Sequence, residues 1–338
     1  MRVTTIHAPG DIRLEERPEP EITAPTDAVI KITAGCICGS DLWPYRGAND
    51  VTPGTPIGHE MVGVVEEVGS EVRSFRPGDF VVVPFCTCDN TCPHCRHGAQ
   101  SACLHGGMIA GGQGEYGLVS QAEGSLVKTD GPPDATMIPS LLTLADVFPT
   151  GWHCAVSAGV RKGDTVVVVG DGAVGLCGVL AAAQMGAERV IAMSRHEPRQ
   201  QIARAFGATH VVAERGKEGA AAIKELTDGV GADAVLECVG TDDAMRQAFA
   251  VARPGSTVGF VGVPHGVDVP VARMFAKNIG LAGGVAPVRR YLPELLDLVT
   301  SGTVNPGLVF DTVLPLSEVA AGYRAMDERT AIKVLLEP

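Results

Sequence analysis

A glycine-rich turn between two apolar segments constrains the fold of this chain more than any other feature. It has the spacing G-x-G-x-x-G, follows the apolar run 165–169 and precedes residues 174–185, which have helical spacing. In a strand-turn-helix context such glycines let the backbone approach a pyrophosphate, which rests at the positive end of the helix dipole. The sequence therefore predicts a dinucleotide site that includes Gly170, Gly172, Ala173, Val174 and Gly175.

The same segment opens a regular alternation of apolar runs and helical patterns. The apolar runs cover residues 165–169, 189–192, 210–212, 232–238 and 257–263. Such alternation with buried strands is typical of an α/β fold with a parallel, doubly wound sheet of the Rossmann type.

Residues 1 to about 147 have a different texture. Short strands are expected at 28–33, 61–68, 79–83 and 115–119, separated by Pro-Gly and Gly-Gly turn signals. This pattern indicates an irregular, mostly antiparallel β unit. After about residue 285 come helices at 291–300 and 317–326 and a last strand at 332–336.

The net charge and the polar first residues indicate which classes of binding partner to expect. The formal net charge is −12, which argues against nucleic acid or an anionic membrane surface, because both are bound mainly by clustered Lys and Arg. The apolar stretch 165–185 is interrupted by Asp171 and several glycines, so a membrane span is not expected there. Residues 1–7 lack the apolar core of a secretory signal, and a cytoplasmic location with a small-molecule substrate is expected.

A cysteine and a histidine lie next to the ends of two predicted strands. Cys38 lies just after the strand at 28–33, and His59 comes just before the strand at 61–68. Zinc binds both groups, and a catalytic site uses three protein ligands with one position open. Asp41 and Glu60 are suited to contact the ligands rather than the metal, because a carboxylate there can accept a hydrogen bond from the imidazole N–H that does not bind zinc. The alternative is a buried thiol and a hydrogen-bonded histidine without metal.

The segments GCICGSDLWPYRG and GHEMVGVVEEVG resemble the zinc-dependent alcohol dehydrogenases of the medium-chain dehydrogenase/reductase superfamily, and the resemblance extends through nearly the whole chain. It implies a GroES-like catalytic domain from residues 1–147 and 286–338 and a Rossmann domain from residues 148–285. It also implies that Cys38 is a zinc ligand and Cys36 is not. The Ser40 hydroxyl would hydrogen-bond the substrate oxygen.

The resemblance places the third catalytic ligand on the helix that enters the nucleotide domain. There the acid is Asp146, and the segment resembles the formaldehyde-dehydrogenase-like branch, in which an aspartate at this position binds the zinc. His153 and Cys154 are nearby alternatives, and a helix acid without a metal role is another.

Half of the ten cysteines lie between residues 86 and 103. In a cytosolic protein this density indicates metal binding. The family's structural zinc site has the spacing CxxCxxCx7C, and counting back from Cys103 reaches Cys95, Cys92 and then Asp89. Because a carboxylate is a competent zinc ligand, these four are the first choice, and Cys88 is the rival fourth ligand. Free or redox-active thiols without metal are the alternative.

The end of the second strand indicates which nicotinamide cofactor is preferred. Ser194, Arg195 and Arg199 stand where an NAD site would have a carboxylate for the ribose. Arginines accommodate a 2′-phosphate through charge-assisted contacts, so NADP is the preferred cofactor; a solvated basic loop is the alternative. By resemblance, Lys333 contacts the pyrophosphate and Thr150 lies near the nicotinamide.

The predicted reaction is hydride transfer between an alcohol or carbonyl substrate and the cofactor. Trp43 occupies the position at which many family members have a proton-relay histidine, so the relay must end differently. Trp43, Tyr45 and Phe148 would line an apolar pocket or simply pack in the core.

Two other functions compete with this one: a zinc-independent NADPH reductase of quinones or enones on the same fold, and a non-catalytic nucleotide-binding protein. Those reductases lack the zinc-ligand set that Cys38, His59 and Asp146 would provide in this chain. The family forms dimers or tetramers, and a homotetramer is expected over a dimer.

Overall fold

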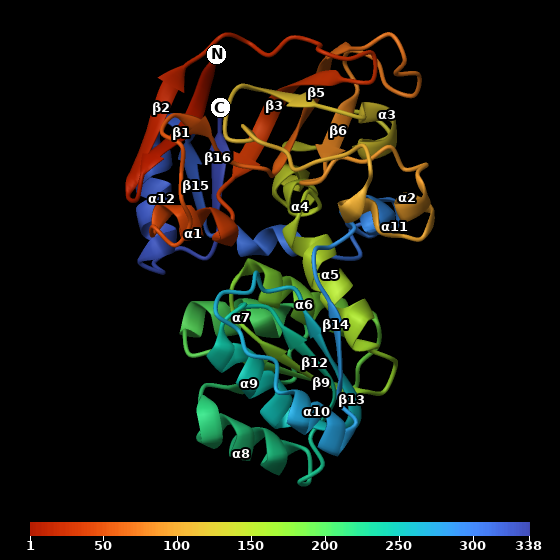
Figure 1. The fold of residues 1–338 in the computed structure, drawn as a ribbon, viewed down its shortest axis with the longest axis vertical. Coiled ribbons are helices and arrows are strands. Elements are labelled where there is room, and N and C mark those ends of the chain that lie inside the picture. Colours follow the sequence, from red (N-terminus) through yellow and green to blue (C-terminus); the bar gives the residue numbers. More distant parts are fainter. The chain divides into compact units, whose positions relative to one another are not determined.

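The computed structural model describes all 338 residues and divides the chain into two compact units. Met1–Pro149 and Pro287–Pro338 form the first, which holds both ends of the chain, and Thr150–Ala286 form the second (Figure 1). Helix α5 (Val147–Ala158) carries the chain from the first unit into the second. No helix combines the length and apolarity needed to cross a membrane.

The first unit is built on a seven-stranded sheet. Its strands are β3 (Ala28–Cys36), β5 (Met61–Val68), β6 (Phe80–Val83), β7 (Tyr116–Val119), β8 (Val127–Lys128), β15 (Thr312–Pro315) and β16 (Val334–Glu337). They follow the order β15-β16-β3-β5-β6-β8, with β7 also paired to β3. Every pairing is antiparallel except that of β15 with β16. The last strand of the chain thus pairs beside β3, which explains why both ends belong to one unit.

Besides α5, the first unit contains six helices. They are α1 (Leu42–Tyr45), α2 (Pro93–Arg96), α3 (Ala122–Ser125), α4 (Ile138–Thr143), α11 (Val288–Thr300) and α12 (Val319–Asp327), with 3-10 turns η1 (Gly39–Asp41), η2 (Gln100–Ala102), η3 (Ala135–Met137), η4 (Pro306–Val309) and η5 (Leu316–Glu318).

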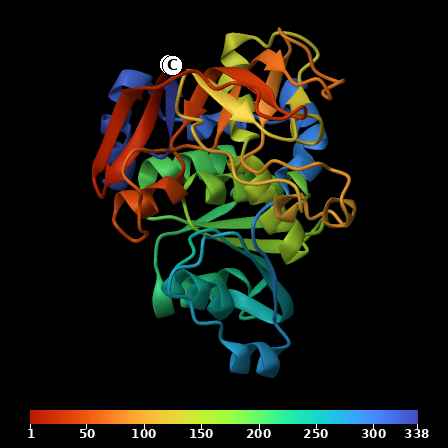
Figure 2. The same cartoon turned by 45° about the horizontal axis from the view of Figure 1, so that its top comes forward.

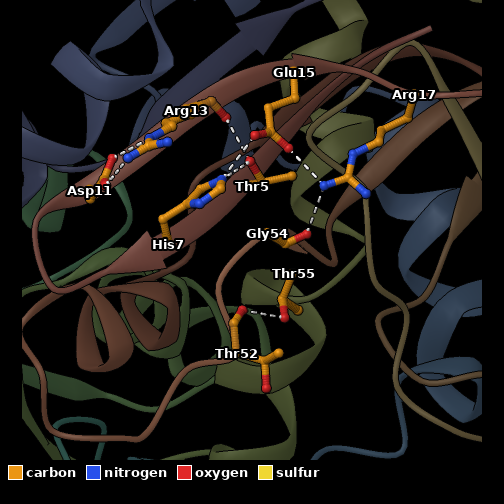
Figure 3. Close-up of polar contacts among 9 residues, drawn as sticks. All are labelled: Thr5, His7, Asp11, Arg13, Glu15, Arg17, Thr52, Gly54 and Thr55. Atoms are coloured by element: carbon orange, nitrogen blue, oxygen red, sulfur yellow. Dashed lines mark hydrogen bonds and ion pairs between the residues drawn. The ribbon is translucent and has the colours of Figure 1, made fainter.

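A second, three-stranded sheet pairs β1 (Arg2–Ala8) with β2 (Asp11–Glu16) and with β4 (Thr55–Pro56). Figure 3 shows polar contacts that tie this sheet to the loop after α1. The Glu15 carboxylate meets His7 Nε2 at 3.0 Å and Arg17 Nη2 at 2.7 Å, and Arg17 also donates to the carbonyl of Gly54 at 3.1 Å. The Arg17 contact thus links the end of β2 to the loop at Gly54.

The second unit is a parallel six-stranded sheet with helices on both faces. The strands are β9 (Thr165–Val169), β10 (Arg189–Met193), β11 (His210–Val212), β12 (Ala232–Glu237), β13 (Ala252–Phe260) and β14 (Gly280–Gly283), in the order β11-β10-β9-β12-β13-β14. The helices are α6 (Ala173–Gln184), α7 (Glu197–Ala205), α8 (Gly216–Leu226), α9 (Asp242–Val251) and α10 (Val271–Lys277). This strand order is that of the Rossmann fold.

Strand β9 shows how the residues specify this layering. Val167 and Val169 pack in one apolar core with Met245 and Phe249 of α9, while Val168 on the opposite face lies next to Gly178 of α6. Side chains alternate between faces in a strand, so a run of valines covers both. Helices lie on both sides of the sheet in the ribbon drawings (Figures 1 and 2). The predicted fold class, a GroES-like β domain with a Rossmann domain, is confirmed.

Candidate metal and nucleotide sites

Cys38 is positioned by the turn that follows β3. Its backbone N–H donates to Asp41 Oδ2 at 3.0 Å, and its Sγ accepts the backbone N–H of Ser40 at 3.5 Å. Together these bonds form a reciprocal cap on η1. The turn therefore fixes the thiol and places the half-buried Ser40 beside it.

Three predicted ligand atoms converge at this point of the first unit. Asp146, between α4 and α5, has its Oδ2 atom 3.6 Å from Cys38 Sγ and 3.4 Å from His59 Nε2. None of the three residues is more than 9% exposed. The other imidazole nitrogen, Nδ1, faces Asp41 Oδ1 at 3.6 Å. The alternatives for the third ligand, His153 and Cys154, belong to the second unit.

These separations fit a tetrahedral zinc ion. With Zn–S near 2.3 Å and Zn–N or Zn–O near 2.0 Å, tetrahedral angles place S and O about 3.5 Å apart and N and O about 3.3 Å apart. The observed 3.6 and 3.4 Å agree with these values. A thiol, an imidazole and a carboxylate can therefore hold one divalent cation without rearrangement.

The electrostatics of the group also favour a cation. Burial raises the pKa of the Cys38 thiol and of the Asp41 carboxyl, although His59 opposes both shifts. Burial alone would favour neutral imidazole, but the Cys38 and Asp41 charges raise the pKa of His59 well above its usual range. An excess of acidic groups is thus crowded around one imidazole, and a divalent cation would relieve it.

Glu60 lies closer to the ligand group than the sequence suggested. It belongs with Cys38, His59 and Asp146 to a set of donor atoms that all lie within 4.8 Å of one another. Its Oε1 pairs with Lys333 Nζ at 2.7 Å, whereas its buried Oε2 has no hydrogen-bond partner. This oxygen is a further potential donor to a cation.

Lys333 is itself almost completely buried. Besides the ion pair with Glu60, its Nζ donates to the carbonyl of Ile37 at 3.2 Å. Its predicted contact with a pyrophosphate stays a prediction.

Two residues that the sequence analysis did not identify support Asp41. Gln113 Nε2 donates to Asp41 Oδ2 at 3.0 Å and to the carbonyl of Cys36 at 3.2 Å. Tyr323 Oη donates to Gln113 Oε1 at 3.1 Å. Both side chains are essentially inaccessible. A buried chain of polar groups thus runs from Tyr323 through Gln113 and Asp41 to the imidazole of His59. No local motif marks Gln113 or Tyr323, because they meet only in the folded chain.

The second predicted metal cluster lies in the turn-rich segment around α2. Donor atoms of Asp89, Cys92, Cys95 and Cys103 lie within 4.8 Å of one another. Cys92 Sγ is 3.5 Å from Cys95 Sγ and 3.9 Å from Cys103 Sγ, close to the separation of about 3.8 Å for two thiolates on tetrahedral zinc. Hydrogen bonding by the Leu104 N–H lowers the pKa of the Cys92 thiol to about 7.

The rival ligand Cys88 points elsewhere. Its Sγ contacts the carbonyl of Gly124 at 3.4 Å, and its N–H donates to Ser125. Asp89 instead receives the N–H groups of Thr91 and Cys92 and meets His105 Nδ1 at 2.5 Å. Although burial opposes it, these contacts lower the pKa of Asp89, which keeps the carboxylate ionised.

The glycine-rich turn in the second unit has the predicted setting between β9 and α6. A Cβ atom on Gly175 would collide with the carbonyl oxygen of Gly170, which itself has a φ of +120°. A Cβ on Gly172, the cap of α6, would meet nothing within 4 Å. Close packing at the third glycine and open approach at the second suit a pyrophosphate at the start of this helix.

The end of β10 differs from the sequence-based expectation. Ser194 Oγ donates to Asp171 Oδ2 at 2.9 Å, so the turn itself supplies a carboxylate there. Arg199 donates to the Asp171 carbonyl at 2.9 Å and lies 3.8 Å from its Oδ1, and it is only 7% exposed. Arg195 is exposed. Of the two arginines predicted to bind a 2′-phosphate, Arg199 thus already faces the Asp171 carboxylate.

The remaining predicted residues have less specific surroundings. Thr150 is buried at the start of the second unit. Tyr45 packs on Tyr323 with ring centroids 5.4 Å apart, and Phe148 is fully buried, so core packing accounts for both. Trp43 is half-buried.

Known proteins resemble this chain along its whole length. The family model for the alcohol dehydrogenase GroES-like domain matches residues 24–131, and that for zinc-binding dehydrogenases matches residues 173–301. Zinc-type alcohol dehydrogenase B of Aspergillus flavus is 35% identical over 353 aligned residues, which cover 100% of this chain and 81% of that protein. This chain belongs to the zinc-dependent alcohol dehydrogenase family.

Two further relatives agree. The NADP-dependent isopropanol dehydrogenase of Thermoanaerobacter brockii is 34% identical over 342 residues, covering 96% of this chain and 94% of that protein. The solved structure of alcohol dehydrogenase TADH from a Thermus species has a TM-score of 0.91 and 32% identity, covering 100% of this chain and 99% of that one. This zinc-dependent alcohol dehydrogenase homologue is therefore an oxidoreductase of alcohols or carbonyl compounds, which confirms the family resemblance inferred from the sequence; the resemblance to the branch with an aspartate ligand stays a prediction.

Proposed function

We propose that this enzyme transfers a hydride between an alcohol or carbonyl substrate and NADP(H), with zinc held by Cys38, His59 and Asp146. In the oxidative direction a secondary or primary alcohol and NADP⁺ give the carbonyl compound, NADPH and a proton. The observation that carries the proposal is the convergence of three buried donors at separations expected around tetrahedral zinc. Zinc bound there would supply Lewis acidity toward the substrate oxygen.

The residues of the first unit hold and orient the reacting groups. Asp41 faces His59 Nδ1, which selects the tautomer that leaves Nε2 available as a ligand. Ser40, in the same turn as Cys38, is proposed to accept the substrate hydroxyl proton. Trp43 cannot titrate, so the proton leaves through water or another side chain.

Ser40 can be tested with a matched pair of variants. Ser40→Thr keeps a hydroxyl and should retain most activity, whereas Ser40→Ala should lower kcat by about 100-fold. Equal activity of the two variants at saturating substrate would remove Ser40 from the proton path.

The preference for NADP rests on charge at the end of β10. Ser194 occupies the usual place of the ribose-binding acid, and the exposed Arg195 is next to it. The Thermoanaerobacter brockii relative is NADP-dependent. Arg195→Asp should shift the ratio of kcat/KM values toward NAD by about tenfold or more; an unchanged ratio would contradict the assignment.

We propose that Asp89, Cys92, Cys95 and Cys103 hold a second, structural zinc. All four positions are taken by protein donors, so no site remains for substrate.

We also propose that the enzyme forms a homo-oligomer, a tetramer rather than a dimer. Helix α10 exposes 67% of Val271 and 87% of Phe275, and it precedes the edge strand β14. Large exposed apolar side chains beside a sheet edge indicate a protein interface. Light scattering measures the subunit number: a tetramer is expected, a dimer would contradict the preference for a tetramer, and a monomer would contradict the whole proposal.

The experiment that tests the function is a panel of initial rates. Primary and secondary alcohols, polyols, aldehydes and ketones are each measured with NADP(H) and NAD(H), and quinones and enones are included. Alcohol oxidation with NADP supports the proposal. Turnover confined to quinones or enones would favour a reductase, and absence of turnover despite nucleotide binding would favour a non-catalytic nucleotide-binding protein.

A further inference from the structure

The glycine-rich turn supplies an acid where the second strand of the sheet ends. Asp171 stands between the first two glycines of the G-x-G-x-x-G motif, and its side chain is only 9% exposed. Its Oδ2 accepts the hydroxyl of Ser194 at 2.9 Å. In Rossmann domains the residue at the end of this strand faces the 2′ position of the adenosine ribose. The Asp171 carboxylate, which comes from the glycine-rich turn, therefore lies at the end of β10, where the strand itself supplies no acid.

The same carboxylate alters the positive charge available for a 2′-phosphate. Arg199 lies 3.8 Å from Asp171 Oδ1 and donates to the Asp171 carbonyl. Arg215 donates to the backbone carbonyl of Met193 at 2.9 Å. Arg195 is the exposed guanidinium of the group. Asp171 thus offsets one of the arginines nearest to the strand end.

We propose that Asp171 is a specificity-determining residue that limits the preference for NADP over NAD. This inference rests on the nucleotide site proposed above. A 2′-phosphate bound beside Ser194 is repelled by the Asp171 carboxylate and attracted by Arg195, whereas a 2′-hydroxyl can donate a hydrogen bond to that carboxylate. The enzyme therefore accepts both cofactors, and the acid sets the size of the discrimination.

The decisive variant is Asp171→Asn. The amide has the same shape as the carboxylate and keeps an oxygen that accepts the Ser194 hydroxyl, and the backbone bond from Arg199 is unaffected. The negative charge is lost, and with it the ion pair between Oδ1 and Arg199, which frees that guanidinium to face a phosphate. Removal of one charge near the bound phosphate should tighten its binding by about tenfold.

Binding of two nucleotide fragments tests this without turnover. Calorimetry gives the Kd values of 2′,5′-ADP and 5′-ADP for the wild type and for Asp171→Asn at one ionic strength. The expected result is that Asp171→Asn binds 2′,5′-ADP about tenfold more tightly, relative to 5′-ADP, than the wild type does. An unchanged or lower preference for 2′,5′-ADP would overturn the proposal.

Asp171→Glu is the matched control, because it keeps the charge on a longer side chain. Its preference should stay within about twofold of the wild type, and a rise as large as that of Asp171→Asn would overturn a role for charge. If Asp171→Asn does not fold, Asp171→Ser is measured in its place. Binding of 5′-ADP by the wild type supports the nucleotide site whatever the variants do. Failure of the wild type to bind either fragment would overturn that site and the role of Asp171 together.

Discussion

The two donor clusters of the first unit use similar chemistry in different settings. The proposed catalytic cluster, called the catalytic cluster below, consists of Cys38, His59, Glu60 and Asp146 and combines three kinds of donor near the ends of strands and helices. The proposed structural cluster, called the structural cluster below, consists of Asp89, Cys92, Cys95 and Cys103 and combines one acid with three thiols within fifteen residues of loop and short helix. The first has long-range partners and the second is almost entirely local.

This difference indicates separate roles. Groups distant in sequence surround the catalytic cluster: Gln113 donates to Asp41, which faces His59, and Lys333 pairs with Glu60, whose other buried carboxylate oxygen has no partner. In the structural cluster backbone N–H groups of neighbouring residues orient Asp89 and the thiols. A site held by the whole domain can keep a fixed geometry with an open position, whereas a local closed site mainly stabilises its own loop.

Loss of a catalytic ligand should produce the largest effect on activity. Cys38→Ser is expected to lower kcat/KM by more than about 100-fold, because serine is a poor zinc ligand at neutral pH. The melting temperature should change little, since the core of the sheet is unaffected. Activity near the wild-type level, with one zinc per chain lost, would reverse the roles of the two clusters.

Loss of a structural ligand should have the opposite signature. Cys95→Ser is expected to remove one zinc per chain and to lower the free energy of unfolding by several kcal/mol, since structural zinc contributes folding energy. The activity of the remaining folded enzyme should be close to that of the wild type. Metal analysis and thermal unfolding measure both quantities. An unchanged zinc content would remove Cys95 from the ligand set.

The hydrogen bonds behind the catalytic cluster should matter less than the ligands themselves. Gln113→Leu takes a donor from Asp41 and is expected to weaken metal affinity by about tenfold. Tyr323→Phe leaves the amide in place and should have a smaller effect. Chelator competition measures the affinity, and the absorption spectrum of the cobalt-substituted enzyme reports ligand geometry. An unaltered spectrum and affinity in Gln113→Leu would show that Asp41 is held by its other contacts.

Asp233, a carboxylate outside both clusters, provides a reference for which substitution should change stability only slightly. Burial raises the pKa of Asp233, but the Thr165 N–H and Arg253 outweigh it and lower the pKa below its usual value. Its stabilising contribution is therefore present above the unfolded-state pKa and is lost as pH falls through the lower folded-state value.

Asp233→Asn should consequently be less stable than the wild type by about 1 kcal/mol at pH 7. The difference should shrink below about pH 4. Denaturant unfolding across this range measures it, and a difference independent of pH would exclude the charge of Asp233 as its cause.

Much of the fold could be predicted because local patterns agree with tertiary structure. The valine run at β9 and the apolar run at β5 were predicted with the bounds that the structure shows. Strand β3 was predicted to end at residue 33 but continues to Cys36. Gly35 lies within this strand and does not end it. A Cβ on Gly35 would collide with the carbonyl oxygen of Gly112, which belongs to a segment distant in the sequence.

Strand β13 begins earlier than expected for a similar reason. The prediction started it at residue 257, just after Pro254 and Gly255, which are typical turn residues. In the structure Ala252 already pairs with Ala232, and the register shifts before Thr257. Tertiary pairing overrides the local signal.

The candidate sites show the same limit. Motifs and spacing identified Cys38, His59 and the cluster ending in Cys103, because these residues stand in recognisable local contexts. Gln113 could not be found in this way, since its role depends on distant chain segments meeting. The absence of an acid at the end of β10 was read correctly from the sequence, but the approach of Asp171 to Ser194 was not foreseeable without coordinates.

The division of labour between the clusters is tested most directly by following activity during stepwise removal of zinc. A chelator of increasing strength is applied, and zinc per chain, turnover with an alcohol and NADP, and melting temperature are measured on the same samples. We expect two zinc ions per chain. One loss should abolish turnover with little change in melting temperature, and the other should lower the melting temperature. Turnover that survives removal of all zinc would contradict the account.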